Sequence, residues 1–193
     1  MFGRRGFVAI LGGAALGGGL GLVLRSDAGT LKGPSRLRPP GAGLEAEFLS
    51  ACIRCSQCVE ACPYDSIRPS GPADGLAAGA PWIDSRHTPC FLCRDHDALL
   101  CVLACPTAAL TDPGSIDAIR MGTAEIDPGR CLAFNGVMCR ACWHACPYPN
   151  AAIRYDSMLR PVVGASSCIG CGLCDQACLA EPSAIHIRPG GEG

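Results

Sequence analysis

Cysteine spacing is the feature that most constrains this chain, because all sixteen cysteines among its 193 residues fall into four groups of four. The first group follows the pattern C-x2-C-x2-C-x3-C, and the last group repeats it. The second and third groups each place seven residues between two of their cysteines. Proline follows the fourth cysteine in the first three groups. The groups are Cys52, Cys55, Cys58 and Cys62; Cys90, Cys93, Cys101 and Cys105; Cys131, Cys139, Cys142 and Cys146; Cys168, Cys171, Cys174 and Cys178.

This spacing is typical of cysteines that bind cubane iron–sulfur clusters. Three thiolates two residues apart can reach three corners of a cubane from one tight loop. The fourth cysteine lies about one helical turn further on and points toward a neighbouring cluster. Because four complete sets leave no cysteine over, the sequence predicts four [4Fe–4S] clusters, with all sixteen cysteines as ligands.

Disulfides and zinc are the alternatives for so many cysteines. Disulfide frameworks do not repeat this spacing with a terminal proline, and cysteines two residues apart rarely bridge each other without strain. Structural zinc sites take two pairs of ligands, whereas each group here is a triplet with a more distant fourth member. The pattern therefore favours iron–sulfur clusters.

The composition of the chain limits the classes of function further. Aromatic residues make up only 5% of the chain, so the clusters must supply much of its cohesion. Lys32 is the only lysine and no basic stripe with interleaved aromatic residues occurs, so we expect no nucleic-acid partner. The histidines share no spacing and no pattern of acidic partners, and we expect none of them to be functional: His87, His96, His144 and His186.

The two ends of the chain differ from its centre. Residues 1–28 have the three regions of an export signal, and the pair Arg4-Arg5 followed by Phe7 is similar to a twin-arginine signal. That route carries folded cargo, as a cluster protein assembled in the cytosol requires. An uncleaved membrane anchor is the alternative. Residues 29–43 are predicted to be an exposed linker and residues 189–193 a disordered tail.

An internal repeat predicts the fold of residues 44–188. A short apolar strand precedes the second, third and fourth cysteine groups, as at Pro81-Trp82-Ile83. After every group, a turn of helix leads to another apolar position: Ile67, Leu110, Ile153 and Ile185. Two such units make a two-cluster ferredoxin-like module. We therefore predict a loop-rich α+β fold of two such modules, held together by their clusters.

Two pairings of the groups are possible. Groups one and four are regular, and groups two and three mirror each other, which favours an inner module (about 81–155) nested inside an outer one (about 44–80 plus 156–188). The distances after the fourth cysteine favour chain order instead, since Ile67 and Leu110 lie five residues beyond it in groups one and two. Ile153 and Ile185 lie seven residues beyond it in groups three and four. Nesting predicts these ligand sets: Cys52, Cys55, Cys58 with Cys178; Cys168, Cys171, Cys174 with Cys62; Cys90, Cys93, Cys101 with Cys146; Cys131, Cys139, Cys142 with Cys105.

Several motifs resemble the NapG/MauM family of ferredoxin-type proteins over roughly residues 37–189. They are the segments 38–42, 52–65, 115–122 and 131–136. The resemblance implies a periplasmic protein with four [4Fe–4S] clusters. It also implies electron transfer from a membrane quinol-oxidising iron–sulfur partner toward a periplasmic reductase, such as nitrate reductase, or its cytochrome. Alternatives are a role in methylamine oxidation, a subunit of another exported molybdenum enzyme, or a maturation or targeting factor.

A fully cysteine-ligated cubane has no open coordination site, so we expect an electron carrier and not an enzyme with a substrate of its own.

Overall fold

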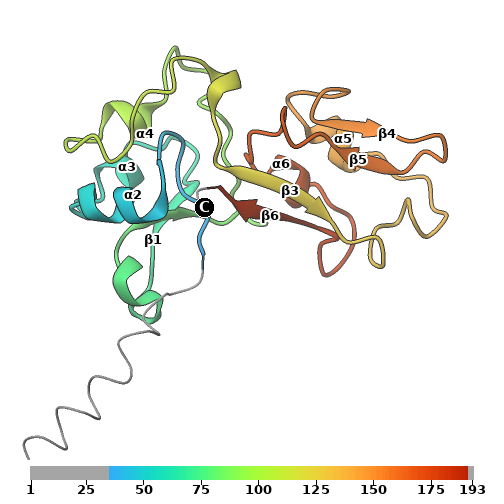
Figure 1. The fold of residues 1–193 in the computed structure, drawn as a ribbon, viewed down its shortest axis with the longest axis horizontal. Helices are drawn as coiled ribbons and strands as arrows, with labels where there is room; N and C mark the ends of the chain where they lie inside the picture. Colours follow the sequence, from blue (N-terminus) through green and yellow to red (C-terminus); the bar gives the residue numbers. More distant parts are fainter. Residues whose placement is uncertain (1–34, 191–193) are drawn as a thin grey trace, which may run out of the picture. The chain divides into compact units, whose positions relative to one another are not determined.

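The computed structural model describes residues 35–190, which form a loop-rich α+β fold of short helices and two-stranded sheets (Figure 1). The predicted signal lies outside the described residues. Within residues 35–190, no helix has the length and apolar character needed to cross a membrane. The helical segments are α2 (Glu45–Ala51), α3 (Gln57–Glu60), η1 (Pro72–Ala77), α4 (Leu100–Leu103), η2 (Ile116–Ala118), α5 (Ala141–Ala145) and α6 (Leu173–Gln176). The strands are β1 (Ile67–Pro69), β2 (Pro81–Ile83), β3 (Gly122–Ile126), β4 (Ile153–Tyr155), β5 (Pro161–Val163) and β6 (Ile185–Pro189).

Strand pairing divides this region into two modules that follow chain order. In the first module, residues 37–111, β1 pairs antiparallel with β2, and Ala42 forms a bridge with Leu110. In the second module, residues 121–190, β4 pairs with β5, and β3 pairs with β6 as the long ribbon of Figure 1. Each module thus pairs the segment before its first cysteine group with the segment after its second, and pairs the two inner segments with each other.

The nested arrangement predicted from the cysteine spacing is therefore wrong. Strands flanking groups one and two pair only with each other, and so do strands flanking groups three and four. The helices agree, since α3 packs against α4, and α5 packs against α6. Similar spacing made groups one and four look alike, but likeness between two loops does not decide which strands share hydrogen bonds.

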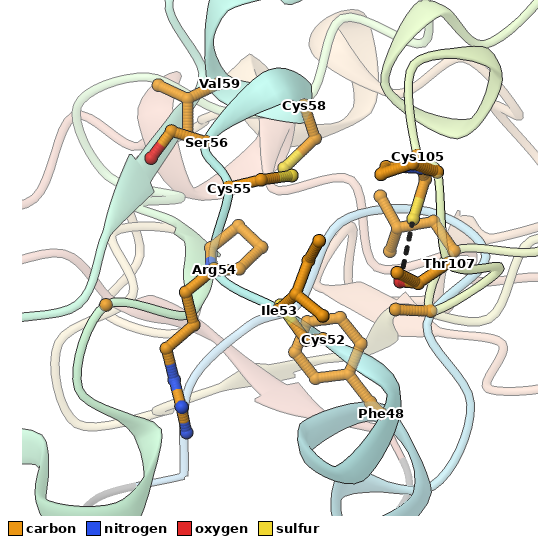
Figure 2. Close-up of a pocket in the computed structure, with 15 residues that line it drawn as sticks. Phe48, Cys52, Ile53, Arg54, Cys55, Ser56, Cys58, Val59, Cys105 and Thr107 are labelled. Atoms are coloured by element: carbon orange, nitrogen blue, oxygen red, sulfur yellow. Dashed lines mark hydrogen bonds between the residues drawn. The ribbon is translucent and has the colours of Figure 1, made fainter.

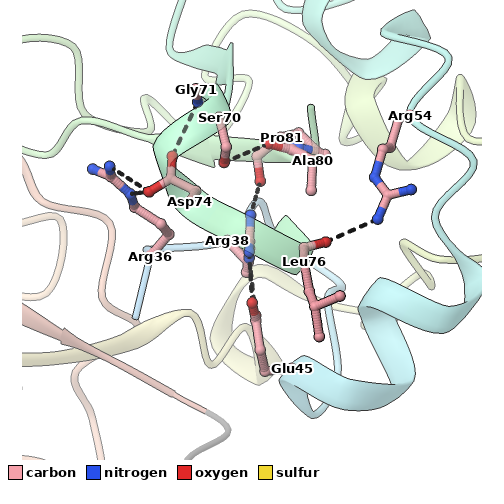
Figure 3. A network of polar contacts seen from close by, with 10 residues as sticks. All are labelled: Arg36, Arg38, Glu45, Arg54, Ser70, Gly71, Asp74, Leu76, Ala80 and Pro81. Atoms are coloured by element: carbon pink, nitrogen blue, oxygen red, sulfur yellow. Dashed lines mark hydrogen bonds and ion pairs between the residues drawn. The ribbon is translucent and has the colours of Figure 1, made fainter. Parts of the chain in front are cut away.

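The predicted linker also differs from the structure, because its last part belongs to the first module. Leu37 is buried, and Pro39 and Pro40 are almost inaccessible to solvent. The Arg38 guanidinium donates to the Pro81 carbonyl at 2.8 Å and pairs with Glu45 (Figure 3). Arg38 therefore ties this segment to the start of β2.

Residues 189 and 190, predicted to begin a disordered tail, are ordered in the structure. Pro189 is the last residue of β6 and lies opposite Gly122. The Gly190 N–H donates to the Met121 carbonyl at 2.7 Å. The apolar side of β6 continues the ribbon to this point, so the strand ends later than its composition indicated.

Candidate iron–sulfur sites

Four hollows in the described region are each lined by four cysteines. Each site takes three cysteines from one group and the fourth from the other group of the same module. The sets are site one, Cys52, Cys55, Cys58 and Cys105; site two, Cys90, Cys93, Cys101 and Cys62; site three, Cys131, Cys139, Cys142 and Cys178; site four, Cys168, Cys171, Cys174 and Cys146.

These sets keep the predicted triplets and change every fourth member. The exchange of the fourth cysteine between two groups, expected from the spacing, is present, but it joins group one with group two and group three with group four. Cys105 lies in the hollow of Cys52 and Cys55, and Cys178 lies in that of Cys131. The ligand sets predicted for nested modules are therefore corrected along with the modules.

Left-handed backbone positions let the regular loops wrap around a hollow. In the first loop, Arg54 and Ser56, on either side of Cys55, have φ values of 57° and 60°. In the fourth loop, the equivalent residues are Gly170 and Gly172, with φ values of 75° and 86°. Positive φ reverses the chain direction within two residues, so neighbouring thiols face the same space.

Short helices carry the third and fourth cysteines of each group in different directions. The third cysteine lies within α3, α4, α5 or α6 and is buried. The fourth comes at or just after the end of the same helix. Cys105, for example, follows α4, whose C-cap residue is Ala104. One helical turn between the two thiols explains why they line different hollows.

Figure 2 shows site one, in which Cys105 is the cysteine contributed by the other group of the module. Cys55 and Cys58 face Cys105 across the hollow, and Phe48 closes one side. Partial burial alone would raise the pKa of Cys105. The neighbouring backbone N–H groups and the Thr107 hydroxyl, 3.9 Å from Sγ, outweigh it and hold that pKa below its usual value. The site therefore favours the thiolate that a metal cluster requires.

Backbone donors also reach sulfur atoms in the second module. The Ala124 N–H in β3 donates to Cys168 Sγ at 3.4 Å, and the Ala184 N–H donates to Cys178 Sγ at 3.3 Å. Hydrogen bonds to ligand sulfurs are among the features that set the reduction potentials of iron–sulfur clusters.

Burial and mutual repulsion raise the pKa of the inner thiols. Burial first, and then the charges of Cys52 and Cys55, raise the pKa of Cys58 to about 11. Burial, followed by Cys93 and Cys62, raises the pKa of Cys101 to about 12. Four crowded thiolates in an apolar hollow need positive charge at their centre. A cubane of four irons supplies this charge, so the donor set fits a [4Fe–4S] cluster.

The arrangement of the cysteines also bears on the two alternatives to clusters, which are disulfides and zinc. All sixteen cysteines lie within the described residues and all are free thiols. Among residues 35–190, no three His, Cys, Asp or Glu side chains are close enough to share one metal ion. A cubane places each thiolate on a different iron and so keeps its ligands further apart than a single ion does.

Acidic partners of two histidines were missed by the sequence reasoning. His87 Nδ1 lies 2.9 Å from Asp84, three residues earlier, and His186 Nε2 lies 3.1 Å from Glu125 across the β3–β6 ribbon. The first pairing could have been found from its spacing, whereas the second depends on strand register. Both histidines are largely exposed.

Comparison with known proteins also indicates iron–sulfur clusters. A family model for a 4Fe-4S dicluster domain matches residues 51–109, which contain both cysteine groups of the first module. The ferredoxin-type protein NapG of Escherichia coli (strain K12) is 40% identical over 204 aligned positions, covering 97% of this chain and 86% of the relative. This chain belongs to the NapG/MauM family of ferredoxin-type proteins.

The MauM branch of the family is similarly close. The methylamine utilization ferredoxin-type protein MauM of Methylorubrum extorquens is 37% identical over 180 positions, covering 89% of this chain and 80% of the relative. A ferredoxin-type protein NapF of E. coli is 30% identical over 150 positions. The resemblance to the NapG/MauM family found in the sequence motifs is thus confirmed.

Proposed function

We propose that this NapG/MauM family protein is an electron carrier that holds four [4Fe–4S] clusters, one in each cysteine-lined hollow. The observation that carries the proposal is the repetition of one donor arrangement four times, with three cysteines from one loop and one from its partner loop. The dicluster match covers sites one and two. Sites three and four share the strand pairing and the ligand exchange of the first module, which supports two further clusters.

The residues around each hollow suit electron transfer without substrate chemistry. When bound, a [4Fe–4S] cluster accepts and gives up one electron at a time. The protein supplies four thiolates, so every iron is occupied and none is left for a substrate. Apolar linings such as Phe48 and Val59 in site one exclude water, and donors such as Thr107 stabilise negative charge on sulfur. Electron-transfer proteins need this rigid, closed environment.

The resemblance to the family supports a proposal for the direction of electron flow and for the partners. We infer that electrons come from a membrane quinol-oxidising iron–sulfur protein and go to a periplasmic reductase or its cytochrome, with nitrate reductase as the leading candidate. Export in the folded state by the twin-arginine machinery, directed by residues 1–28, would bring the loaded protein to the periplasm. Association with the membrane is compatible with this role.

A second candidate role rests on the MauM relatives, whose names state methylamine utilization. There, the same carrier would serve the oxidation of an amine instead of the reduction of nitrate. A maturation or targeting role for an exported molybdenum enzyme is a third candidate. It predicts labile clusters, whereas the buried thiols of site four favour stable ones.

A potentiometric titration of the loaded protein, followed by electron paramagnetic resonance (EPR), tests the carrier function. We expect several clusters to be reduced reversibly in the potential range of a quinol couple, with no loss of iron over repeated cycles. The apoprotein is the control. Clusters that degrade on one reduction cycle, or that transfer to an acceptor apoprotein, would show an assembly factor instead.

A further inference from the structure

We propose that the four sites form a line in the order one, two, four, three, and that the contact between Cys90 and Cys171 joins the two modules. This inference rests on the proposed four-cluster function and adds the order of the sites, which differs from their order along the chain.

Ligand exchange fixes the neighbours within each module. Cys62 comes from the first loop but lines site two, and Cys105 comes from the second loop but lines site one. Cys146 and Cys178 link sites three and four in the same way. Sites one and two are therefore neighbours, and so are sites three and four.

A backbone hydrogen bond connects site two of the first module with site four of the second module. The Cys90 N–H donates to the Cys171 carbonyl at 2.9 Å, so a ligand of site two is bonded through the main chain to a ligand of site four. The two side chains are also buried. Among the described residues, no hydrogen bond of this kind joins a ligand of site one or two to a ligand of site three.

Side chains from the segment before Cys90 hold this junction together. The Ser85 hydroxyl donates to the buried Asp175 carboxylate at 2.7 Å. Arg86 Nη1 donates to the carbonyls of Asp175 at 2.7 Å and Cys178 at 3.0 Å. Residues of the first module thus bind the α6 segment of the second module at several points.

Gly172 permits this close approach. A Cβ atom at Gly172 would lie 2.6 Å from the Ser85 Cβ, a distance that packed side chains do not allow. The residue at the same place in the first loop is Ser56, which is exposed. Glycine next to Cys171 is therefore explained by the module junction as well as by its positive φ.

Burial of the ligands sets sites four and one apart, whereas sites two and three each have two buried cysteines. Site four has three buried cysteines, as expected for an internal site, whereas site one contains Cys55, the only exposed cysteine among the sixteen. Site three is flanked by the exposed side chains of Met138, at 80%, and Leu179, at 71%, next to its ligands Cys139 and Cys178. Sites one and three are the ends of the line.

The order assigns a role to each site. One electron moves at each transfer, so a site is oxidised as its neighbour is reduced. The iron–sulfur donor and the metal-containing acceptor proposed above supply and remove the electron at the two end sites. Sites two and four carry it across the module junction.

Spin coupling between pairs of reduced clusters tests the order. The variant Cys55→Ala/Cys139→Ala retains sites two and four, and Cys55→Ala/Cys168→Ala retains sites two and three. A third variant, Cys55→Ala/Cys93→Ala, retains sites three and four and is the positive control. Each should bind about eight iron atoms. Iron analysis thereby separates failure of cluster binding from failure of the proposed order.

We expect the reduced first variant and the positive control to give the broadened EPR spectrum of two interacting spins, and the second variant to give two independent signals. Coupling in the second variant without coupling in the first overturns the order. If a variant loads fewer than two clusters, iron anomalous scattering from crystals of the intact loaded protein answers the same question. The cluster nearest that of Cys90 in the second module should then be the cluster of Cys171, and finding that of Cys131 there refutes the proposal.

Discussion

Cys105 shows how single residues adjust the sites. Its thiol lies at the end of α4, where backbone N–H groups and the Thr107 hydroxyl all face the sulfur. A thiolate bound to iron carries no proton, so the Thr107 hydroxyl must then be the donor. Donation of this kind stabilises the reduced state, which carries more negative charge, and so raises the reduction potential.

Replacing Thr107 by valine should lower the potential of one cluster. Loss of one hydrogen bond of about 0.5–1 kcal/mol corresponds to roughly 20–40 mV for one electron. The variant Thr111→Val is the control, because the Thr111 hydroxyl donates to the Gly41 carbonyl and not to sulfur. A redox titration monitored by EPR should show one of the potentials displaced by Thr107→Val and none by Thr111→Val. Unchanged potentials in both variants would contradict the assignment of this hydroxyl to site one.

At the scale of elements, the regular cluster loops differ in what packs on them. Gly170 is pressed against β3, where an added Cβ would lie 2.3 Å from the Gly122 nitrogen. Arg54 occupies the same loop position in the first module, also with positive φ, but its side chain extends into solvent and donates to the Leu76 carbonyl at 2.9 Å. The same backbone shape therefore requires glycine only in the fourth loop.

The variant Gly170→Ala should lose the cluster of site four, because the new Cβ collides with main-chain atoms that cannot turn away. Iron per chain should fall by about four. Arg54→Ala is the matched control and should keep all of its iron. Iron and sulfide analysis of both proteins, purified in parallel, measures the difference. Full iron content in Gly170→Ala would show that β3 does not constrain the loop.

The sequence predicted the elements well but not their pairing. The apolar segments expected before and after the cysteine groups are β2, β3, β5 and the positions Ile67, Leu110, Ile153 and Ile185. Turn residues and apolar runs mark strands locally. Pairing is a long-range property, and the mirrored loop spacing pointed to the wrong partner. The number of residues between the fourth cysteine and the following apolar position indicated the correct pairing. This number sets how far the following strand lies from its cluster.

At the scale of the whole described region, long-range contacts of arginine were the least predictable feature. Arg36 lies over the Trp82 ring at 4.3 Å and pairs with the buried Asp74 at 2.8 Å. Arg38 binds the Pro81 carbonyl, and Arg86 crosses to the second module. A Pro- and Gly-rich segment read alone indicates an exposed linker. Only the fold shows that the side chains of Arg36 and Arg38 hold this segment against the first module.

Arg86→Ala should loosen the junction between the modules. Losing the hydrogen bonds to two carbonyls should cost about 1–2 kcal/mol, which corresponds to a roughly 5- to 30-fold change in the opening equilibrium. Hydrogen exchange followed by mass spectrometry should show faster exchange in the peptide that contains Cys90, whose N–H spans the junction. Arg68→Ala on β1, in the same module, is the control and should exchange as the parent protein does. Equal protection of this peptide in Arg86→Ala would mean that other contacts hold the modules.

The central claim is that four sets of cysteines hold four clusters, and iron and sulfide analysis of the loaded protein tests it most directly. Four cubanes predict about sixteen iron and about sixteen sulfide per chain. Protein determined by amino-acid analysis gives the denominator, and the same preparation treated with an iron chelator and an oxidant gives the blank. A value near eight iron per chain, or zinc in stoichiometric amounts, would contradict the four-cluster account.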